Sequence, residues 1–267
     1  MAKPLILITN DDGISAPGIK ALIEVCQKIG DVIVIAPDSP QSGQGHAITL
    51  ESPLRIHKST IFPGVEAYEC SGTPVDCVKI AKHIIIKERV VDLCVSGINH
   101  GSNAATNILY SGTMSAAMEA SLEGINSIGF SLLDYRHEAN FEEAKPYIET
   151  IIQHVLNNGM TAGNLYNVNI PKLTKEEIKG IKICRQADAR WKEDYTEATD
   201  PRGKKYYWLT GSFVNEDYGD DTDVAALVDG YISIVPSHHD LTNYKAINKD
   251  NWSDLVSVNF NKGTARK

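Results

Sequence analysis

The stretch PLILITNDDGISAPGIKALIEVCQKIGDVIVI, residues 4–35, decides the fold class. It opens with a short apolar run from Pro4 to Thr9, which is typical of a strand buried on both faces of a parallel sheet. After Pro17, apolar residues recur at helical spacing until Gly30, so the segment has proline near the start of a helix and glycine past its end. The following apolar run predicts a second buried strand. Strand, helix and strand in this order form a βαβ unit.

The same alternation continues to about residue 170. We predict a helix from Pro74 toward Ile85, a strand at 90–95, a loop rich in Gly, Asn and Ser at 96–112, a helix at about 113–123, a strand near 128–132 and a helix at roughly 141–156. Alternating strands and helices favour a three-layer, doubly wound α/β core with a mainly parallel sheet. The sequence therefore predicts such a core in residues 1–170.

The remainder, residues 171–267, has a different pattern. The turn-forming letters DPRG lie between polar and aromatic strand-like segments, which predicts a long hairpin from Tyr195 to Phe213. A hairpin of this length is marginal on its own in water, so we expect Tyr206, Tyr207 and Trp208 to pack against another subunit. We interpret this portion as a smaller part of one integrated fold that carries oligomerisation elements.

Composition limits the classes of protein that fit. The chain has 267 residues and a net charge of −8 at pH 7, which disfavours binding to a nucleic-acid duplex because such proteins concentrate Lys and Arg. Five cysteines without a C-x-x-C pair suit reduced thiols rather than a disulfide framework. The start of the chain leaves no room for a signal peptide, and no apolar run approaches membrane-spanning length. We therefore expect a cytoplasmic protein without membrane contact.

Two adjacent aspartates, Asp11 and Asp12, directly follow the first predicted strand. Ligand sites of doubly wound folds lie beyond the carboxyl ends of the strands, which is where this pair falls. Gly13 permits a turn that brings both carboxylates to one point, and a divalent cation relieves their repulsion. Oxygen ligands favour Mg²⁺, Mn²⁺ or Ca²⁺ over zinc. Taken alone, the letters NDDG fit a simple connecting turn equally well.

Other loops at the same predicted edge supply further oxygen atoms. They are APDSPQSG from Ala36 and SGINHGSN from Ser96, the second of which contains Asn99. The residue types do not decide between Ser39 and Ser42 in the first loop. Ser111, Gly112 and Thr113 stand at the start of a predicted helix, where unsatisfied amides and the helix dipole favour an anion. An ordinary helix cap is the simpler interpretation of Ser111 or Thr113. A metal opposite an anion site indicates hydrolysis of a phosphate ester.

Several rival motifs fail. GQGHAI, from Gly43, lacks the third glycine of a dinucleotide fingerprint, and the chain has neither a Walker sequence nor a G-x-S-x-G elbow. The histidines lack the H-E-x-x-H spacing of a zinc site. His46 and His100 fall in the proposed site loops and could donate to a phosphate, although loop histidines are more often surface residues.

Taken together, these segments resemble the SurE survival-protein family of metal-dependent 5'/3'-nucleotidases. The matching segments extend over essentially the whole chain and begin at Thr9, Ala36, Gly72, Ser96, Tyr110, Asp200 and Asp229: TNDDGISAPGI, APDSPQSG, GTPVDCV, SGINHGSN, YSGTMSAAMEA, DPRGKKYYWLTG and DGYISIVPSHHDLT. Met114 and Ala120 depart from the family's usual valine and glycine. Neither departure removes an oxygen ligand.

The resemblance implies a Rossmann-like core, homodimers or homotetramers that exchange C-terminal elements, and dephosphorylation of nucleoside monophosphates. It also implies one divalent cation per subunit, Mg²⁺ or Mn²⁺, with Ca²⁺ as another possible occupant in a crystal. The family's metal ligands map onto Asp11, Asp12, Ser42 and Asn99. We predict contacts with the phosphate or the rest of the substrate at Asn10, Gly43, Ser111, Gly112 and Thr113.

The predicted reaction is therefore hydrolysis of a nucleotide phosphomonoester by a metal-activated water. Asp11 or Asp12 would also orient or deprotonate that water, so we regard both as catalytic residues. Two alternatives stay open at this point. One is a nucleotide-binding sensor that keeps the cleft without hydrolysis, and the other is a phosphatase with a covalent aspartyl-phosphate on Asp11.

Overall fold

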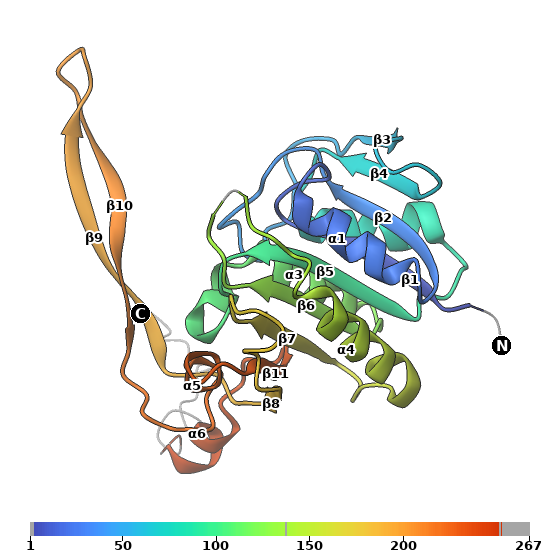
Figure 1. Cartoon of the computed structure of the whole chain (residues 1–267). Helices are drawn as coiled ribbons and strands as arrows, with labels where there is room; N and C mark the ends of the chain where they lie inside the picture. Colours follow the sequence, from blue (N-terminus) through green and yellow to red (C-terminus); the bar gives the residue numbers. More distant parts are fainter. Residues whose placement is uncertain (1–2, 137, 251, 253–267) are drawn as a thin grey trace, which may run out of the picture.

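A computed structural model describes residues 3–136, 138–250 and 252 of the chain. Within these residues, nine strands form one twisted sheet through the middle of the molecule (Figure 1). The strands are β1 (Leu5–Thr9), β2 (Asp31–Pro37), β3 (Ile56–Ser59), β4 (Glu66–Cys70), β5 (Leu93–His100), β6 (Ser127–Leu132), β7 (Asn164–Ile170), β8 (Ile181–Ile183) and β11 (Ile232–His238).

The order of the strands places a topological switch point in the sheet. The order is β3-β4-β2-β1-β5-β6-β7-β11-β8, and the run from β4 to β7 is parallel throughout. The chain moves outward in one direction from β1 to β2 and in the other direction from β5 to β6, so the reversal lies between β1 and β5. Doubly wound sheets bind ligands at the carboxyl ends of the strands at this point. The fold is thus the predicted α/β class.

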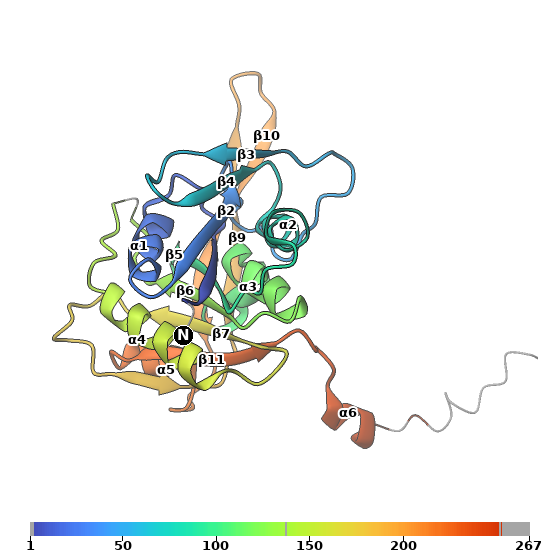
Figure 2. The ribbon, with the colours of Figure 1, turned by 90° about the vertical axis from the view of Figure 1, so that its right-hand side faces the viewer.

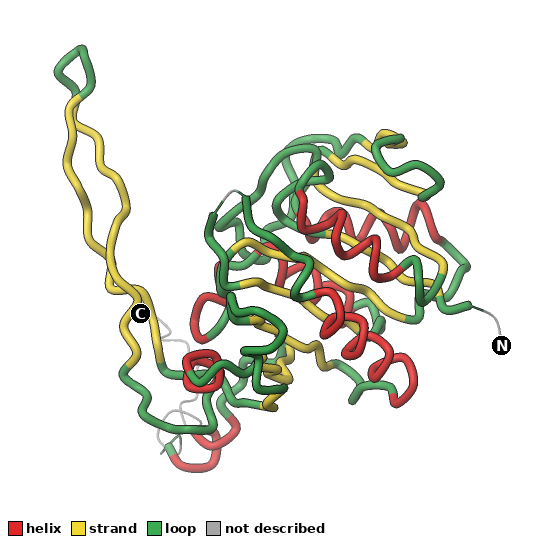
Figure 3. Tube along the Cα trace, viewed as in Figure 1, coloured by secondary structure: helices red, strands yellow, loops and turns green. Residues whose placement is uncertain are grey.

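Helices cover both faces of the sheet. Figures 1 and 2 show α1 and α4 on one face and α2 and α3 on the other, which gives three layers. Figure 3 shows the same helices and strands along the Cα trace. The helices are α1 (Pro17–Cys26), α2 (Pro74–Ile80) with a π-helical continuation η1 (Ala81–Ile86), the 3-10 helix η2 (Ala105–Tyr110), α3 (Gly112–Leu122), α4 (Lys145–Asn158), α5 (Asp223–Val228) and α6 (Tyr244–Lys249).

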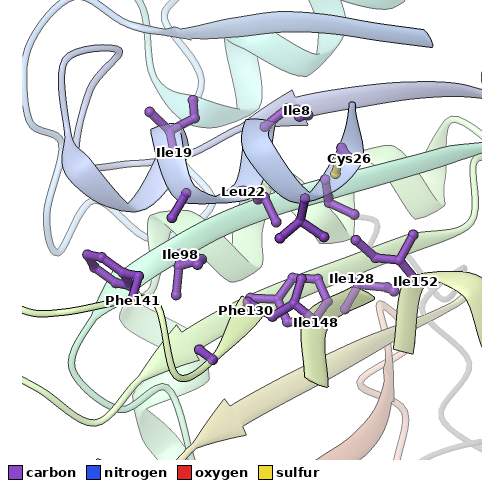
Figure 4. Close-up of a cluster of buried hydrophobic side chains, with 14 of the residues drawn as sticks. Ile8, Ile19, Leu22, Cys26, Ile98, Ile128, Phe130, Phe141, Ile148 and Ile152 are labelled. Atoms are coloured by element: carbon purple, nitrogen blue, oxygen red, sulfur yellow. The ribbon is translucent and has the colours of Figure 1, made fainter. Parts of the chain in front are cut away.

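The core is divided between the two faces of the sheet by the alternation of side chains along each strand. Ile6 and Ile8 of β1 pack with α1 and α4, whereas Leu5 and Leu7 pack with α2 and α3. All five residues of β1 are buried, as expected for a central strand covered on both faces. Figure 4 shows the cluster on the first face, in which Phe130 of β6 is fully buried.

Most predicted elements of the core are present with small shifts at their ends. The βαβ unit is confirmed, and the predicted helix near 113–123 and strand near 128–132 are α3 and β6. Thr73 caps α2, which begins at Pro74 as predicted: the Thr73 side chain accepts from the backbone N–H of Asp76, and the Asp76 carboxylate accepts from the backbone N–H of Thr73.

Three boundaries differ from the prediction. The strand predicted at 90–95 begins at Leu93 and continues to His100, and the predicted loop at 96–112 also contains η2, so it is much shorter than expected. β1 and β6 both pair with β5 as far as Ser96, and β6 alone pairs with Asn99 and His100, after a register shift between Ser96 and Asn99. The helix predicted from residue 141 begins at Lys145, because Pro146 suits the first turn of a helix and not its interior.

The C-terminal portion contributes to the sheet and to a separate hairpin. Strands β8 and β11 join the main sheet beyond β7. The predicted hairpin is confirmed and is longer than expected, with β9 (Ala189–Thr199) paired to β10 (Lys205–Asn215), and it projects away from the body (Figure 1). Trp208 and Leu209 on it are well exposed. Among the described residues, no helix combines the length and the apolar character needed to cross a membrane.

Candidate functional site

The candidate site lies at the switch point, where three segments meet. Asp11 and Asp12 follow β1, Asn99 stands near the end of β5, and Ser42 lies in the loop after β2. Gly13 makes the turn after the two aspartates with a φ of +91°, a conformation that residues with a side chain rarely adopt. The βαβ unit and its neighbouring strand thus position all four of the predicted ligands.

Backbone hydrogen bonds hold the Ser42 loop against the Asp11 loop. The N–H of Gln41 donates to the carbonyl of Asp11 at 2.8 Å, and the N–H of Ile14 donates to the carbonyl of Pro37 at 2.9 Å. Ser39, the other serine of this loop, donates its hydroxyl to Asp38 at 2.9 Å. The structure therefore places Ser42 beside the carboxylates and gives Ser39 a different partner.

Asp11 is buried against the start of α3. The Thr113 hydroxyl donates to its Oδ1 at 2.5 Å, and a Cβ on Gly112 would lie 2.6 Å from the Asp11 Cβ. Burial and the adjacent charge of Asp12 raise the pKa of Asp11 to about 6, while the hydroxyl and the backbone N–H of Thr113 oppose that rise. Thr113 therefore holds the Asp11 carboxylate by a hydrogen bond, and the absence of a side chain at Gly112 leaves room for Asp11.

Asp12 has a carboxylate oxygen without a protein partner. Its Oδ2 is buried and accepts no hydrogen bond from the described residues. Burial raises the pKa of Asp12, and the backbone N–H of His100 opposes that rise. Because buried carboxylate oxygens are ordinarily paired, an unpaired one at a ligand site fits a cation or a donor from substrate.

Asn99 presents its oxygen in a similar way. Its side-chain amide nitrogen donates to the backbone carbonyls of His100 and Gly101 at 3.2 and 3.0 Å. These bonds fix the orientation of the amide and occupy its donors, so Oδ1 is the atom left to accept or to ligate.

These side chains line one cavity of about 310 Å³. Six of the predicted site residues are among its lining: Asp11, Asp12, Ser42, Gly43, Asn99 and Ser111. Asn10, Gly112 and Thr113 do not line it. Asn10 instead donates its side-chain amide to the carbonyl of Gly13 at 2.9 Å and stabilises the turn.

The start of α3 faces the cavity through Ser111. The Ser111 hydroxyl accepts from the N–H of Met114 at 3.0 Å, so this residue is the helix cap that the simpler interpretation predicted. Ser111 therefore both caps α3 and lines the cavity.

The two candidate histidines lie in different places. His100 lines the cavity, and its ring packs edge-on against Phe141 with a centroid distance of 5.0 Å. His46 lines another cavity and pairs with the buried Glu119 at 2.8 Å. His100 is thus the histidine that the structure brings to the site.

Other residues of the cavity were not predicted from the sequence. They are Ser102, Asn103, Asn107, Tyr110, Tyr135 and Trp191. Asn103 belongs to a buried amide network, in which its side chain donates to Ser131 and its backbone N–H to Asn169, both at 2.8 Å. The asparagines at alternate positions of β7, Asn167 and Asn169, are a signal of this network, because a buried central strand is otherwise apolar.

The donor set at the cavity suits a hard cation. Two carboxylates, a hydroxyl and an amide oxygen are the ligand types that Mg²⁺, Mn²⁺ and Ca²⁺ prefer, and the unpaired Asp12 oxygen is available among them. In the described part of the chain, this cavity included, no three His, Cys, Asp or Glu side chains are grouped as metal ligands would be, so the ligands here would be two carboxylates with neutral oxygens. The residues therefore fit a divalent metal with few protein ligands.

Fold and site together define a doubly wound α/β protein with an acidic, oxygen-rich site at the switch point of its sheet. The family model described as survival protein SurE matches residues 6–193. Because that match covers more than half of the chain, this protein belongs to the SurE family.

Individual relatives agree with this assignment. Proteins named 5'-nucleotidase SurE from Christiangramia forsetii and Flavobacterium psychrophilum are each 59% identical, over 94% of this chain and 97% and 98% of their own length. The crystal structure of the SurE protein from Aquifex aeolicus superposes with a TM-score of 0.81 at 41% identity, covering 94% of this chain and all of that one. The similarity thus extends over almost the whole of each protein.

Proposed function

We propose that this protein is a 5'-nucleotidase, an enzyme that hydrolyses nucleoside monophosphates to nucleoside and phosphate. The observation that carries the proposal is the cavity at the switch point, where Asp11, Asp12, Ser42 and Asn99 come together beside a helix start. Relatives of up to 59% identity over most of the chain carry the name 5'-nucleotidase.

We assign one divalent cation per subunit, Mg²⁺ or Mn²⁺, to Asp11, Asp12, Ser42 and Asn99. A cation bound there supplies Lewis acidity, which makes water a better nucleophile and neutralises phosphoryl charge. Thr113 and Gly112 fix the Asp11 carboxylate, and the side-chain bonds of Asn99 fix its oxygen. The protein side of the site is in this way organised before substrate arrives.

Asp12 is the residue to which we assign the proton of the attacking water. It lines the cavity, and its Oδ2 is buried and accepts no hydrogen bond from the described residues, so this oxygen is available to the water. We assign Gly43, His100 and Ser111, which line the same cavity, to contacts with the phosphate oxygens.

Both alternatives from the sequence are less well supported. A sensor without catalysis does not account for the nucleotidase names of the relatives. A covalent aspartyl-phosphate on Asp11 needs a carboxylate open to in-line attack, whereas Asp11 is 4% exposed and its Oδ1 is bonded to Thr113.

The proposed enzyme is a homodimer or homotetramer. The support is the hairpin, whose Tyr207, Trp208 and Leu209 are 58%, 63% and 65% exposed on an element that projects from the body. Apolar side chains of this size on a long, separate hairpin are typical of an interface. The division of the chain near residue 170 stays a prediction.

Phosphate release from adenosine 5'-monophosphate tests the proposed function. Protein stripped with a chelator is assayed alone, with Mg²⁺ and with Mn²⁺. We expect release only after a metal is restored. Nucleotide binding without release under every condition would support the sensor, and equal release in chelator would contradict the metal assignment.

A further inference from the structure

A second cavity adjoins the candidate active site. Its volume is about 650 Å³, and its walls include Leu133 and Leu173 together with aromatic rings. It shares four lining residues with the polar cavity: Ser102, Asn107, Tyr135 and Trp191. The two cavities are therefore neighbours, one polar and one largely apolar, with two aromatic side chains where they meet. Both volumes fall in the range of small-molecule sites.

Tyr135 is held in place at this junction. Its hydroxyl accepts from the backbone N–H of Ser102 at 3.2 Å. A Cβ on Gly101 would lie 2.5 Å from a ring carbon of Tyr135, so the ring packs directly over the backbone of Gly101. The ring is nevertheless 69% exposed. Tyr135 thus offers a fixed, open aromatic surface close to Asn99 and His100 of the site.

Trp191 reaches the junction from the base of the hairpin. Its ring meets Phe213 of the paired strand edge-on, with a centroid distance of 6.2 Å. The strand is anchored just before it, where the Thr106 hydroxyl donates to the carbonyl of Ala189 at 2.8 Å. Trp191 is 44% exposed, so it also keeps surface available for a ligand.

A buried carboxylate, that of Asp223, connects the segments that form one wall of the apolar cavity. Asp223 is fully buried and accepts the backbone N–H groups of Ala105 at 2.8 Å and Ala187 at 3.0 Å. It thereby joins η2 and the start of α5, which both border the cavity, to the approach to the hairpin. Each of these contacts is internal to the described chain, so the chain itself supplies this wall of the cavity.

We propose that the apolar cavity binds the base of the nucleoside monophosphate, with Tyr135 and Trp191 as its stacking residues. The inference rests on the proposed function, because it places the phosphate in the polar cavity. A nucleotide has a charged phosphate at one end and a flat base with apolar faces at the other. The polar cavity suits the phosphate, and the adjoining apolar cavity suits the base. Ser102 and Asn107, which line both cavities, lie where the sugar would pass.

This subsite recognises the faces of a base more than its edges. Apart from the Tyr135 hydroxyl and the Trp191 indole N–H, the polar side chains of its lining are those of Ser102, Asn107 and Lys172, and Lys172 lies 3.4 Å from Asp134. Stacking tolerates any base, whereas discrimination between bases needs hydrogen bonds to their edges. We therefore expect all common bases to be accepted, with purines preferred over pyrimidines because their stacking area is larger.

The test compares a substrate that has a base with one that has none. The full-length protein hydrolyses adenosine 5'-monophosphate and ribose 5-phosphate under the same metal conditions, and the ratio of the two kcat/KM values is measured. We expect Tyr135→Leu and Trp191→Leu each to lower this ratio about tenfold, the effect of losing one stacking partner. Tyr135→Phe keeps the ring and is expected to keep the ratio. The matched control is Tyr218→Leu, because Tyr218 is 95% exposed and lines neither cavity.

Binding of adenosine gives a second readout that does not depend on turnover. Adenosine is expected to quench the fluorescence of the native protein, and Trp191→Phe to remove most of the quenching while hydrolysis of the nucleotide continues. An unchanged ratio in both leucine variants, or quenching that persists without Trp191, would overturn the base subsite while phosphate release still supports the nucleotidase. Absence of release from either substrate by the native protein would instead contradict the proposed function.

Discussion

Replacing Thr113 by valine tests how the protein holds Asp11. Valine keeps the shape of threonine and removes the hydroxyl that donates to Asp11 Oδ1 at 2.5 Å. Both residues are buried, with Thr113 at 0% and Asp11 at 4% exposure, so water does not readily replace the lost donor. A hydrogen bond to a charged group contributes about 1.5–3 kcal/mol. Because the backbone N–H of Thr113 also acts on Asp11 and is retained, we expect a loss of about 2 kcal/mol in the free energy of unfolding.

The serine variant is the matched control. Thr113→Ser keeps the hydroxyl and loses the methyl group, whose carbon is near Gly129. Its expected loss of stability is about 1 kcal/mol, the value of one buried methyl group. Urea unfolding of chelator-treated protein measures both changes, and phosphate release from adenosine 5'-monophosphate measures activity.

The two variants are expected to differ in activity more than in stability. Without the hydroxyl, the Asp11 carboxylate is free to rotate away from the position in which it would hold the cation. Because small misplacements of catalytic groups cost activity, Thr113→Val should lower kcat/KM by about ten- to a hundredfold. Thr113→Ser should stay within about threefold of the native value. Equal activity in the two variants would show that the Thr113 hydroxyl does not position Asp11.

Three further predictions concern the metal, the packing of α1 and the hairpin. Mn²⁺ at about a hundred times its Kd should stabilise the native protein by roughly 2.7 kcal/mol and should not stabilise Asp12→Asn; equal shifts in thermal unfolding would contradict the assigned ligand. Gly18→Ala places a Cβ 2.1 Å from the carbonyl oxygen of Ile98, so urea unfolding should show a loss of about 1–3 kcal/mol, and an unchanged midpoint would argue against the close approach of α1 to β5. Joining the paired residues Lys192 and Ser212 by a short Gly-Ser turn should lower the mass seen by light scattering, whereas an unchanged mass would exclude the hairpin from the interface.

Much of the core could be predicted because its local signals agree with the fold. The segment from Pro4 to Ile35 has buried strands, a helix with proline and glycine at its two ends, and no conflicting pattern. Strands β3 and β4 were not predicted, since segments such as IHKS and EAYEC are short and largely polar. The extension of β5 was missed because Gly97 and Asn99 have weak strand propensity, and pairing of Asn99 and His100 with β6 overrides it.

Part of the site could likewise be predicted from local sequence patterns, whereas the rest depends on tertiary contacts. Asp11, Asp12 and Asn99 were expected to converge because parallel strands end at the same edge of a sheet. Ser42 followed only from the family resemblance, since its selection over Ser39 depends on the backbone bond from Gln41 to Asp11.

Tyr135 and Trp191 could not be predicted as site residues. They come from the segment after β6 and from the hairpin, and only the tertiary structure brings them to the same cavity. From the sequence, Tyr135 is simply an aromatic residue in a loop, and Trp191 belongs to the portion predicted to mediate oligomerisation. No local sequence pattern indicates that the two side chains lie close together.

The central claim is that Asp11 and Asp12 form the metal-dependent catalytic site of a nucleotidase. The most direct measurement is the release of phosphate from adenosine 5'-monophosphate by Asp11→Asn and Asp12→Asn in Mg²⁺ or Mn²⁺, with circular dichroism and urea unfolding to verify that each variant folds. We expect both variants to fold and to lose metal-dependent release. A folded variant that releases phosphate at the native rate would contradict it.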